Sequence, residues 1–206
     1  MSNKFVYDTK LSDFNNDIAN LLHPILSDSV SLKSEFKKRK DKYDYVKVHS
    51  ADKDSKLAEN WELEKQFKST VRLKRVKPIS RHFEDRLWCL IYSMGYPILN
   101  GNYFNIIFKR HNNSEGKKQI DVFAKDDETV LIVECKTKEV RGKKSLTSAI
   151  HEIENLKGLM ASSIKRYYNQ ETEPKIVWII ATGNIIWDEK DLGSGPIKGI
   201  HKQAII

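Results

Sequence analysis

Two apolar segments of this chain carry charged residues where a strand would be buried. The segment Val130-Leu-Ile-Val-Glu-Cys-Lys-Thr137 holds Glu134 and Lys136, and Asp121 interrupts the apolar segment Lys118–Ala124. Burying an ionised group costs several kcal/mol unless the group is paired or bound to a metal. The fold must therefore give these three charges a partner.

The order of the predicted elements indicates an α/β unit with a mixed sheet flanked by helices. An amphipathic helix is expected over Arg81–Met94, because Gly95 and then Pro97 end the pattern. After it we expect three strands, a helix and a strand, at Tyr103–Lys109, Lys118–Ala124, Val130–Thr137, Leu146–Tyr168 and Lys175–Ala181. The turn between the second and third strands predicts that they pair antiparallel.

Residues 1–78 are predicted to form a basic accessory region, helical with a short strand, before the main domain at 79–206. Apolar residues recur at helical spacing and stop at Pro24: Leu11, Phe14, Ile18, Leu21 and Leu22. Ser31–Lys42 is expected to be a short basic helix. Thr70–Val76 alternates apolar and basic residues, which predicts a strand with one cationic face. Its candidates for nucleic-acid contact are Arg72, Lys74 and Arg75, and a solvated surface is the alternative.

Charge and composition narrow the class of protein. The chain of 206 residues has a net charge of +8, which favours an anionic partner, most often nucleic acid. No apolar run approaches the roughly 20 residues that span a bilayer, and the N-terminal residues lack the apolar stretch of a secretory signal. Cys89 and Cys135 fit neither a zinc site nor a disulfide framework. We therefore expect a cytoplasmic protein with no membrane partner.

The charges in the two strands predict a metal site. Side chains alternate along a strand, so Glu134 and Lys136 share one face, and a hairpin can place Asp121 beside Glu134. A divalent cation removes the repulsion between two carboxylates, and oxygen ligands favour Mg²⁺ or Mn²⁺ over zinc. The backbone carbonyl of Cys135 is a candidate third ligand. Such a site suits phosphodiester hydrolysis, with Lys136 facing the water or the phosphate. Cross-strand ion pairs on an exposed sheet are the alternative.

These residues carry a resemblance to a known family. Asp121 with Glu134-Cys135-Lys136 resembles the motif of the PD-(D/E)xK nuclease superfamily, although Ile120 stands where that motif usually has proline. The core of that superfamily, with the restriction-endonuclease-like fold, matches residues 81–182. Four segments are also similar to the nuclease-like region before a DndB-like (DGQHR-type) domain of some prokaryotic proteins: Phe83–Trp88, Gln119–Asp127, Val133–Thr137 and Ala181–Trp187. The resemblance implies a Mg²⁺-dependent DNA endonuclease in prokaryotic restriction or defence.

Two helical residues are further candidates. Glu84 falls at the edge of the buried arc of the first helix, whereas Asp85 is expected to point away from it. Nucleases of this superfamily often take another acid from this helix, so the resemblance makes Glu84 a catalytic candidate. Its alternative role is to complement the helix dipole. Lys157 falls in the apolar stripe of the second helix, either as a phosphate contact or with its charge reaching past that stripe to solvent.

Other functions and partners stay open at this level. A DNA-binding module that retains the fold without cleaving, and an RNA-directed nuclease, fit the same charges. The apolar end Gln203-Ala-Ile-Ile206 predicts a chain that continues into a further, DndB-like domain. Cleavage of both DNA strands with one site per chain would favour a homodimer.

Overall fold

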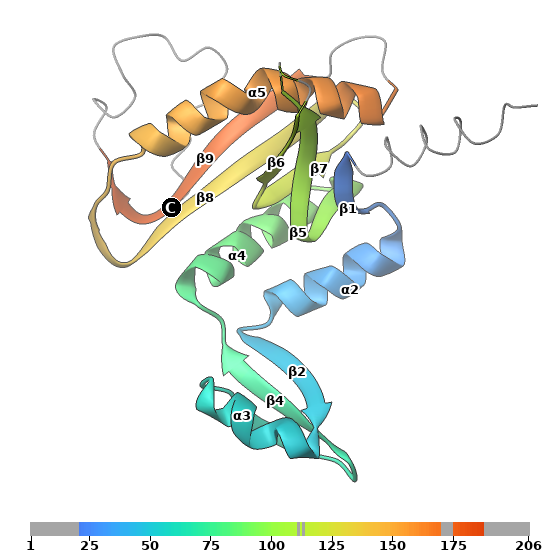
Figure 1. Ribbon diagram of the computed structural model, residues 1–206, viewed down its shortest axis with the longest axis vertical. Coiled ribbons are helices and arrows are strands. Elements are labelled where there is room, and N and C mark those ends of the chain that lie inside the picture. The colour runs from blue at the N-terminus through green and yellow to red at the C-terminus, as the bar shows by residue number, and fades with distance from the viewer. Residues whose placement is uncertain (1–20, 111, 113, 170–174, 188–206) are drawn as a thin grey trace, which may run out of the picture.

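The computed structural model describes residues 21–110, 112, 114–169 and 175–187. Within this part of the chain, a six-stranded mixed sheet is flanked by helices, and a second sheet of three strands is separate from it (Figure 1). The mixed α/β architecture expected from the sequence is therefore confirmed. None of the helices described is both long enough and apolar enough to cross a membrane.

The larger sheet has the strand order β1-β5-β7-β8-β9, and β6 also pairs with β5. The strands are β1 (Leu22–Leu26), β5 (Ile98–Lys109), β6 (Glu115–Gln119), β7 (Val122–Lys125), β8 (Thr129–Lys143) and β9 (Lys175–Ile186). All neighbours are antiparallel except β8 and β9, which run parallel. The predicted hairpin is confirmed, because β7 pairs antiparallel with β8 and sets Val122 opposite Val133.

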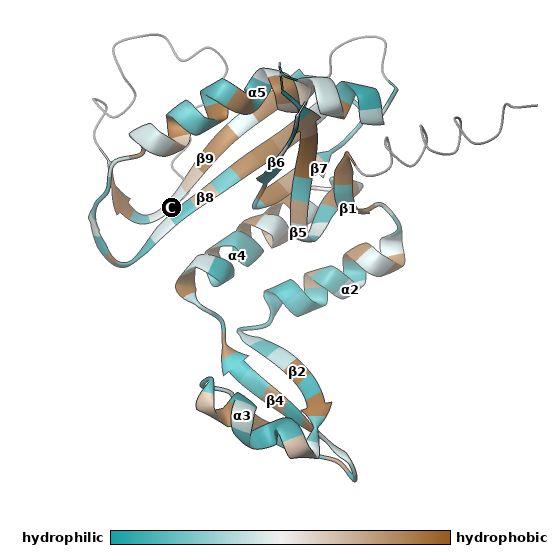
Figure 2. Ribbon diagram, in the orientation of Figure 1, coloured by the Kyte–Doolittle hydropathy of each residue, from teal (hydrophilic) through white to brown (hydrophobic). Residues whose placement is uncertain are grey.

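Helices cover both faces of this sheet, and each face has its own apolar core. Helix α4 (Ile79–Ser93) lies on one face and α5 (Thr147–Tyr167) on the other (Figure 1). Alternation along β8 divides its apolar side chains between the two cores. The core on the α5 side includes Phe123, Val130, Ile132, Ile153 and Met160. The core on the α4 side includes Leu87, Trp88, Ile91, Leu131 and Val133. Figure 2 shows the apolar residues concentrated in the strands between these helices.

Part of the expected accessory region belongs to the larger sheet. Leu22 lies in β1, opposite Ile106 of β5, and not in the helix expected to run to Pro24. The earlier part of that expected helix lies outside the described residues. Helix α2 (Ser29–Lys40) packs on α4 and places Leu32 in the core on the α4 side. The structure thus divides the chain elsewhere than at residue 78, because a sheet edge far along the sequence gives β1 its hydrogen-bond partners.

The smaller sheet is an insertion between α2 and α4. Its strands, in the antiparallel order β2-β4-β3, are β2 (Tyr43–His49), β3 (Glu62–Gln66) and β4 (Thr70–Val76). A short turn, η1 (Ser50–Asp52), and helix α3 (Lys53–Ala58) connect β2 to β3. The predicted strand Thr70–Val76 is confirmed as β4, and Val71 and Leu73 are its buried residues.

The strand expected over Lys118–Ala124 is two strands. Lys118 and Gln119 pair with β5 as part of β6, whereas Val122 begins β7 and pairs with β8. The chain leaves the ladder between them, at Ile120 and Asp121. The change of neighbour puts Asp121 at a free edge of β8, which determines the geometry of the candidate site. The predicted apolar end at 203–206 lies outside the described residues.

Candidate active site

Asp121 lies where the edge of β8 loses its strand neighbour. Pairing between β7 and β8 begins at Val122 and Val133, so β7 provides no acceptor for Cys135. The Asp121 carboxylate takes that place, and Cys135 N donates to its Oδ2 at 2.6 Å. In an extended strand the N–H and C=O of one residue point to the same side. The Cys135 carbonyl therefore lies on the same edge as the Asp121 carboxylate.

Asn100 of β5 fixes the backbone that directly follows Asp121. Its Nδ2 donates to the Asp121 carbonyl at 3.1 Å, and its Oδ1 accepts from Phe123 N at 2.9 Å. Its own carbonyl accepts from the indole of Trp88, and Asn100 is fully buried. Asn100 was not predicted as a site residue. In the sequence, Asn100 is noticeable only as a polar residue directly after the apolar residues Ile98 and Leu99. That position does not reveal which groups its side chain contacts.

Glu134 projects on the α5 face of the sheet and is paired with two lysines. Its side chain is buried, and its Oε1 lies 2.6 Å from Lys136 Nζ and 3.6 Å from Lys118 Nζ. Lys118 also contacts Glu152 of α5, at 2.9 Å. Lys118 and Glu152 were not predicted for the site, because their contact depends on how α5 lies against the sheet. The cross-strand ion pairs considered from the sequence are realised in part.

The protonation of Lys136 follows from this pairing. Burial alone would lower the pKa of its ammonium group. The hydrogen bond to Glu134 and the negative charges of Glu134 and Asp121 outweigh burial, so the pKa of Lys136 stays above its usual value. Lys136 is therefore a cation at neutral pH, fixed beside the carboxylates.

Glu84 of α4 adds a third carboxyl group to the same region. Burial, together with the negative charge of Asp121, raises the pKa of Glu84 to about 7. Burial also raises the pKa of Asp121; the bond from Cys135 N opposes this rise, and the charge of Glu134 adds to it. Around Cys135, burial and then the charges of Asp121, Glu84 and Glu134 raise the pKa of the thiol. The charge of Asp121 thus interacts with Glu84 on the α4 side of the sheet and with Glu134 and Lys136 on the α5 side.

The donor set suits a hard cation with open coordination positions. In the described residues, no group of three His, Cys, Asp or Glu side chains lies close enough to hold a metal ion by side chains alone. Mg²⁺ does not need such a cage, because it binds through one or two carboxylates and keeps its other positions for waters and phosphates. Neither Asp121 nor Glu84 forms an ion pair with any described residue. A cation near Asp121, Glu134 and the Cys135 carbonyl would relieve that excess negative charge.

Asp85 does not point away from the protein, contrary to the expectation from the helical wheel. It is fully buried, and its carboxylate contacts Arg39 at 3.0 Å, Lys77 at 2.8 Å and Arg81 at 3.5 Å. The wheel considers one helix alone, whereas α2 packs against this side of α4. Asp85 therefore joins α2 and the start of α4, and it is not part of the candidate site.

The candidate nucleic-acid residues of β4 divide between two faces. Arg72 and Lys74 share a face with Tyr45 and Tyr43, and their charged groups lie 5.5 Å and 5.0 Å from the centres of these rings. Arg72 also forms an ion pair with Glu64. Arg75 lies on the opposite face by strand alternation, over the ring of Trp61 at 4.5 Å. The single cationic face predicted for β4 therefore excludes Arg75.

Lys157 has no structural connection to the other site residues. It is half-buried on α5 and makes no hydrogen bond or ion pair with any residue that the structure describes. Its predicted contact with phosphate stays a prediction.

Comparison with known proteins adds no family. No protein-family model matches the sequence, and no curated protein matches it. Among solved structures, the chain is similar to that of protein VC1899 from Vibrio cholerae, at 13% identity and a TM-score of 0.38. The match covers 79% of this chain and 44% of that chain, so this chain spans less than half the length of that protein. A likeness of this size carries no argument about function.

Proposed function

We propose that this chain is a metal-dependent nuclease that hydrolyses phosphodiester bonds in DNA, on a restriction-endonuclease-like core. One observation carries the proposal: Asp121 lies at a free edge of β8 and interacts electrostatically with Glu84 of α4 and with Glu134, which pairs with the Lys136 ammonium group. The order of a helix, strands, a helix and a strand supports this part of the proposal, although four strands, β5 to β8, stand where that core has three. A prokaryotic restriction or defence role is part of the same proposal.

Each residue has a distinct role in this proposal. Asp121, Glu134 and the Cys135 carbonyl would hold Mg²⁺ or Mn²⁺, which when bound lowers the pKa of a water and neutralises phosphate oxygens. Lys136 stabilises the negative charge that develops at the phosphate, or orients the attacking water. Glu84, with a pKa of about 7, can accept a proton from that water at neutral pH.

A non-cleaving DNA-binding module is the second candidate function. It is favoured by one observation, namely that Lys136 and Lys118 already neutralise Glu134 without a metal. In this case the ion pairs would stabilise the sheet, and the basic surfaces would bind DNA without cleaving it.

Cleavage of plasmid DNA tests the proposal in Mg²⁺, in Ca²⁺ and in EDTA. The variants are Asp121→Asn, Glu134→Gln and Lys136→Met; Asn is chosen at 121 because its amide oxygen still accepts from Cys135 N. We expect each variant to lose about 100-fold or more in rate while its fold persists. Mg²⁺ should support cleavage and Ca²⁺ mainly binding, because Ca²⁺ tolerates looser geometry.

The matched control is Glu128→Gln in the exposed turn before β8, which should cleave as the wild type does. Wild-type rates in all three site variants would disprove the site. DNA binding without cleavage in any metal would favour the non-cleaving module. Cleavage of RNA but not of DNA would show that RNA, and not DNA, is the substrate.

A further inference from the structure

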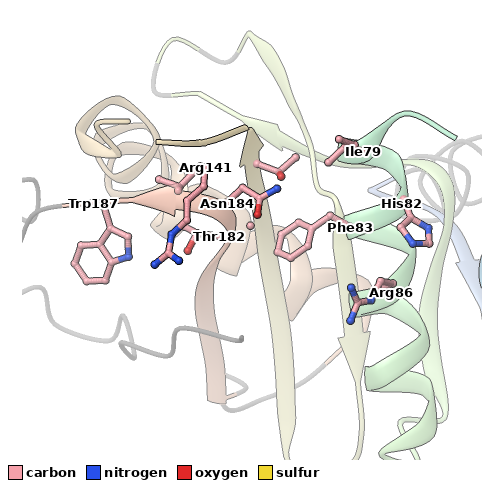
Figure 3. A pocket seen from close by; sticks show the side chains of 11 residues that line it. Ile79, His82, Phe83, Arg86, Arg141, Thr182, Asn184 and Trp187 are labelled. Atoms are coloured by element: carbon pink, nitrogen blue, oxygen red, sulfur yellow. The ribbon is translucent and has the colours of Figure 1, made fainter. Parts of the chain in front are cut away.

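A cavity of about 470 Å³ lies between α4 and the ends of β8 and β9 (Figure 3). This volume is in the range of small-molecule sites. Eleven residues line it: Ile79, His82, Phe83, Arg86, Thr137, Arg141, Thr182, Gly183, Asn184, Ile185 and Trp187. None of them is acidic, although the chain has 28 Asp and Glu residues. Its two arginines therefore make the cavity attractive to an anion.

The two arginines approach the cavity from different elements. Arg86 comes from α4 and Arg141 from the far part of β8 (Figure 3). Neither forms an ion pair or a hydrogen bond with any described residue, and both side chains are exposed. A guanidinium group presents a planar fork of donors that matches the oxygens of a phosphate. The hydroxyl groups of Thr137 and Thr182 add short polar groups to the same walls.

Aromatic side chains form other parts of the wall. The ring of Phe83 packs directly on the backbone of Gly183, where an added Cβ atom would lie 3.2 Å from it. Glycine at this position therefore lets the ring approach β9 closely. Trp187 lines another side of the cavity (Figure 3). Aromatic faces of this kind stack on nucleic-acid bases with little regard to their sequence.

Irregular backbone lies beside the cavity. The pairing of β8 with β9 shifts between Thr137 and Gly142, so β8 bulges and carries Arg141 on the bulge. Asn184 has a φ of 58°, a left-handed conformation that few residues other than glycine adopt. Its side-chain Nδ2 donates to the Lys138 carbonyl at 3.1 Å and ties the two strands together. Such deviations are common beside binding sites.

We propose that this cavity binds a nucleotide, with its base against Phe83 and Trp187 and its phosphate at Arg86 and Arg141. The nucleotide has two possible sources, which are a free mononucleotide and a nucleotide extruded from a bound DNA strand. The second source rests on the proposed DNA binding, whereas the cavity itself does not require cleavage. Thr137 follows Lys136 on β8 but points to the opposite face of the sheet. The cavity adjoins the candidate active site through α4 instead, where Phe83 directly precedes Glu84.

Calorimetry on the full chain in EDTA tests the site without cleavage. The probes are deoxyadenosine monophosphate, deoxyadenosine and inorganic phosphate, and we expect the monophosphate to bind about tenfold or more tightly than either part. Arg86→Gln and Arg141→Gln should each weaken monophosphate binding about tenfold or more, since each removes a charged hydrogen-bond donor. Arg110→Gln, exposed at the end of β5, is the control and should leave binding unchanged.

A DNA duplex with a central 2-aminopurine distinguishes the two sources, because its fluorescence rises when the base leaves the stack. A rise that the free monophosphate reverses supports extrusion from DNA. Monophosphate binding without any rise supports a site for free nucleotides. The proposal would be overturned if the monophosphate did not bind and the fluorescence did not rise. It would also be overturned if both arginine variants bound the monophosphate with wild-type affinity. Asp121→Asn should still bind the monophosphate. Nucleotide binding is therefore tested independently of cleavage, and the nuclease proposal can fail without this one.

Discussion

At the scale of single residues, Asp121 substitutes for a strand. One of its carboxylate oxygens takes the hydrogen bond from Cys135 N that a neighbouring strand would otherwise accept. The other oxygen, Oδ1, accepts no hydrogen bond from a described residue, and Asp121 forms no ion pair with one. Asp121 is thus held by the sheet through one oxygen and left free to bind a ligand through the other, which is the arrangement that a preorganised metal ligand requires.

The raised pKa of Glu84 predicts a pH-dependent stability in the absence of metal. Its pKa in the folded protein, about 7, is above its usual value of 4.5, so the folded state binds this proton more tightly. Its contribution to stability is therefore full below about pH 4.5 and is lost as the pH rises through 7. We expect Glu84→Gln to reduce the loss of stability between about pH 5 and pH 8 by about 1 kcal/mol, after solvent screening.

Urea denaturation of both proteins in EDTA, at each pH, measures this difference. Glu128→Gln, an exposed change of the same type, should follow the wild type. Parallel pH profiles for Glu84→Gln and the wild type would show that the Glu84 carboxyl is ionised normally in the folded protein.

At the scale of elements, Asp85 holds two helices together. Its buried carboxylate contacts Arg39 of α2 and Lys77, which precedes α4; Lys77 Nζ also donates to the carbonyls of Lys38 and Arg39. Removing the Asp85 charge leaves Lys77 buried without an opposite charge, whereas Arg39 keeps its ion pair with Glu35 at 2.9 Å. The contact between α2 and α4 therefore depends on Asp85.

We expect Asp85→Asn to lower the free energy of unfolding by about 3 kcal/mol or more, measured by urea denaturation. The comparison is Glu59→Gln, which removes the exposed ion pair with Lys56. This variant should change the free energy of unfolding by about 0.5 kcal/mol or less. Similar small changes for both variants would mean that water already solvates the Asp85 cluster.

The elements also show what the sequence could predict. Strand β4 and the β7–β8 hairpin were predictable, because strict alternation and a polar turn are local signals. Strand β1 was not, because the spacing of Leu21 and Leu22 also suits a helix and its pairing with β5 is a long-range contact. The charges at Asp121 and Glu134 marked the candidate site because they interrupt apolar segments. Asn100 and Lys118 could not be recognised as neighbours of this site from the sequence, because their contacts depend on strand register.

At the scale of the whole molecule, the exposed face of the smaller sheet is a basic surface separate from the candidate active site. We expect the double variant Arg72→Gln, Lys74→Gln to weaken DNA binding and to reduce its salt dependence by about 1.8 in log–log slope, at about 0.9 per phosphate contact. Titrations at several salt concentrations measure this slope. Arg75→Gln, on the opposite face of β4, is the matched control. If it reduced the salt dependence as much per charge removed, the salt dependence would reflect the net charge of the protein and not phosphate contacts of this face.

The two ends of the smaller sheet meet, because Lys77 N donates to the Lys42 carbonyl at 3.1 Å. A chain that leaves and re-enters a fold at one point can be shortened or exchanged there without changing the register of the rest. We expect that replacing residues 43–76 by a short Gly-Ser turn preserves cooperative unfolding and cleavage of DNA at high protein concentration. Evolution could use the same junction to exchange this insertion without altering the larger sheet. Loss of cooperative unfolding in the shortened chain would contradict this interchangeability.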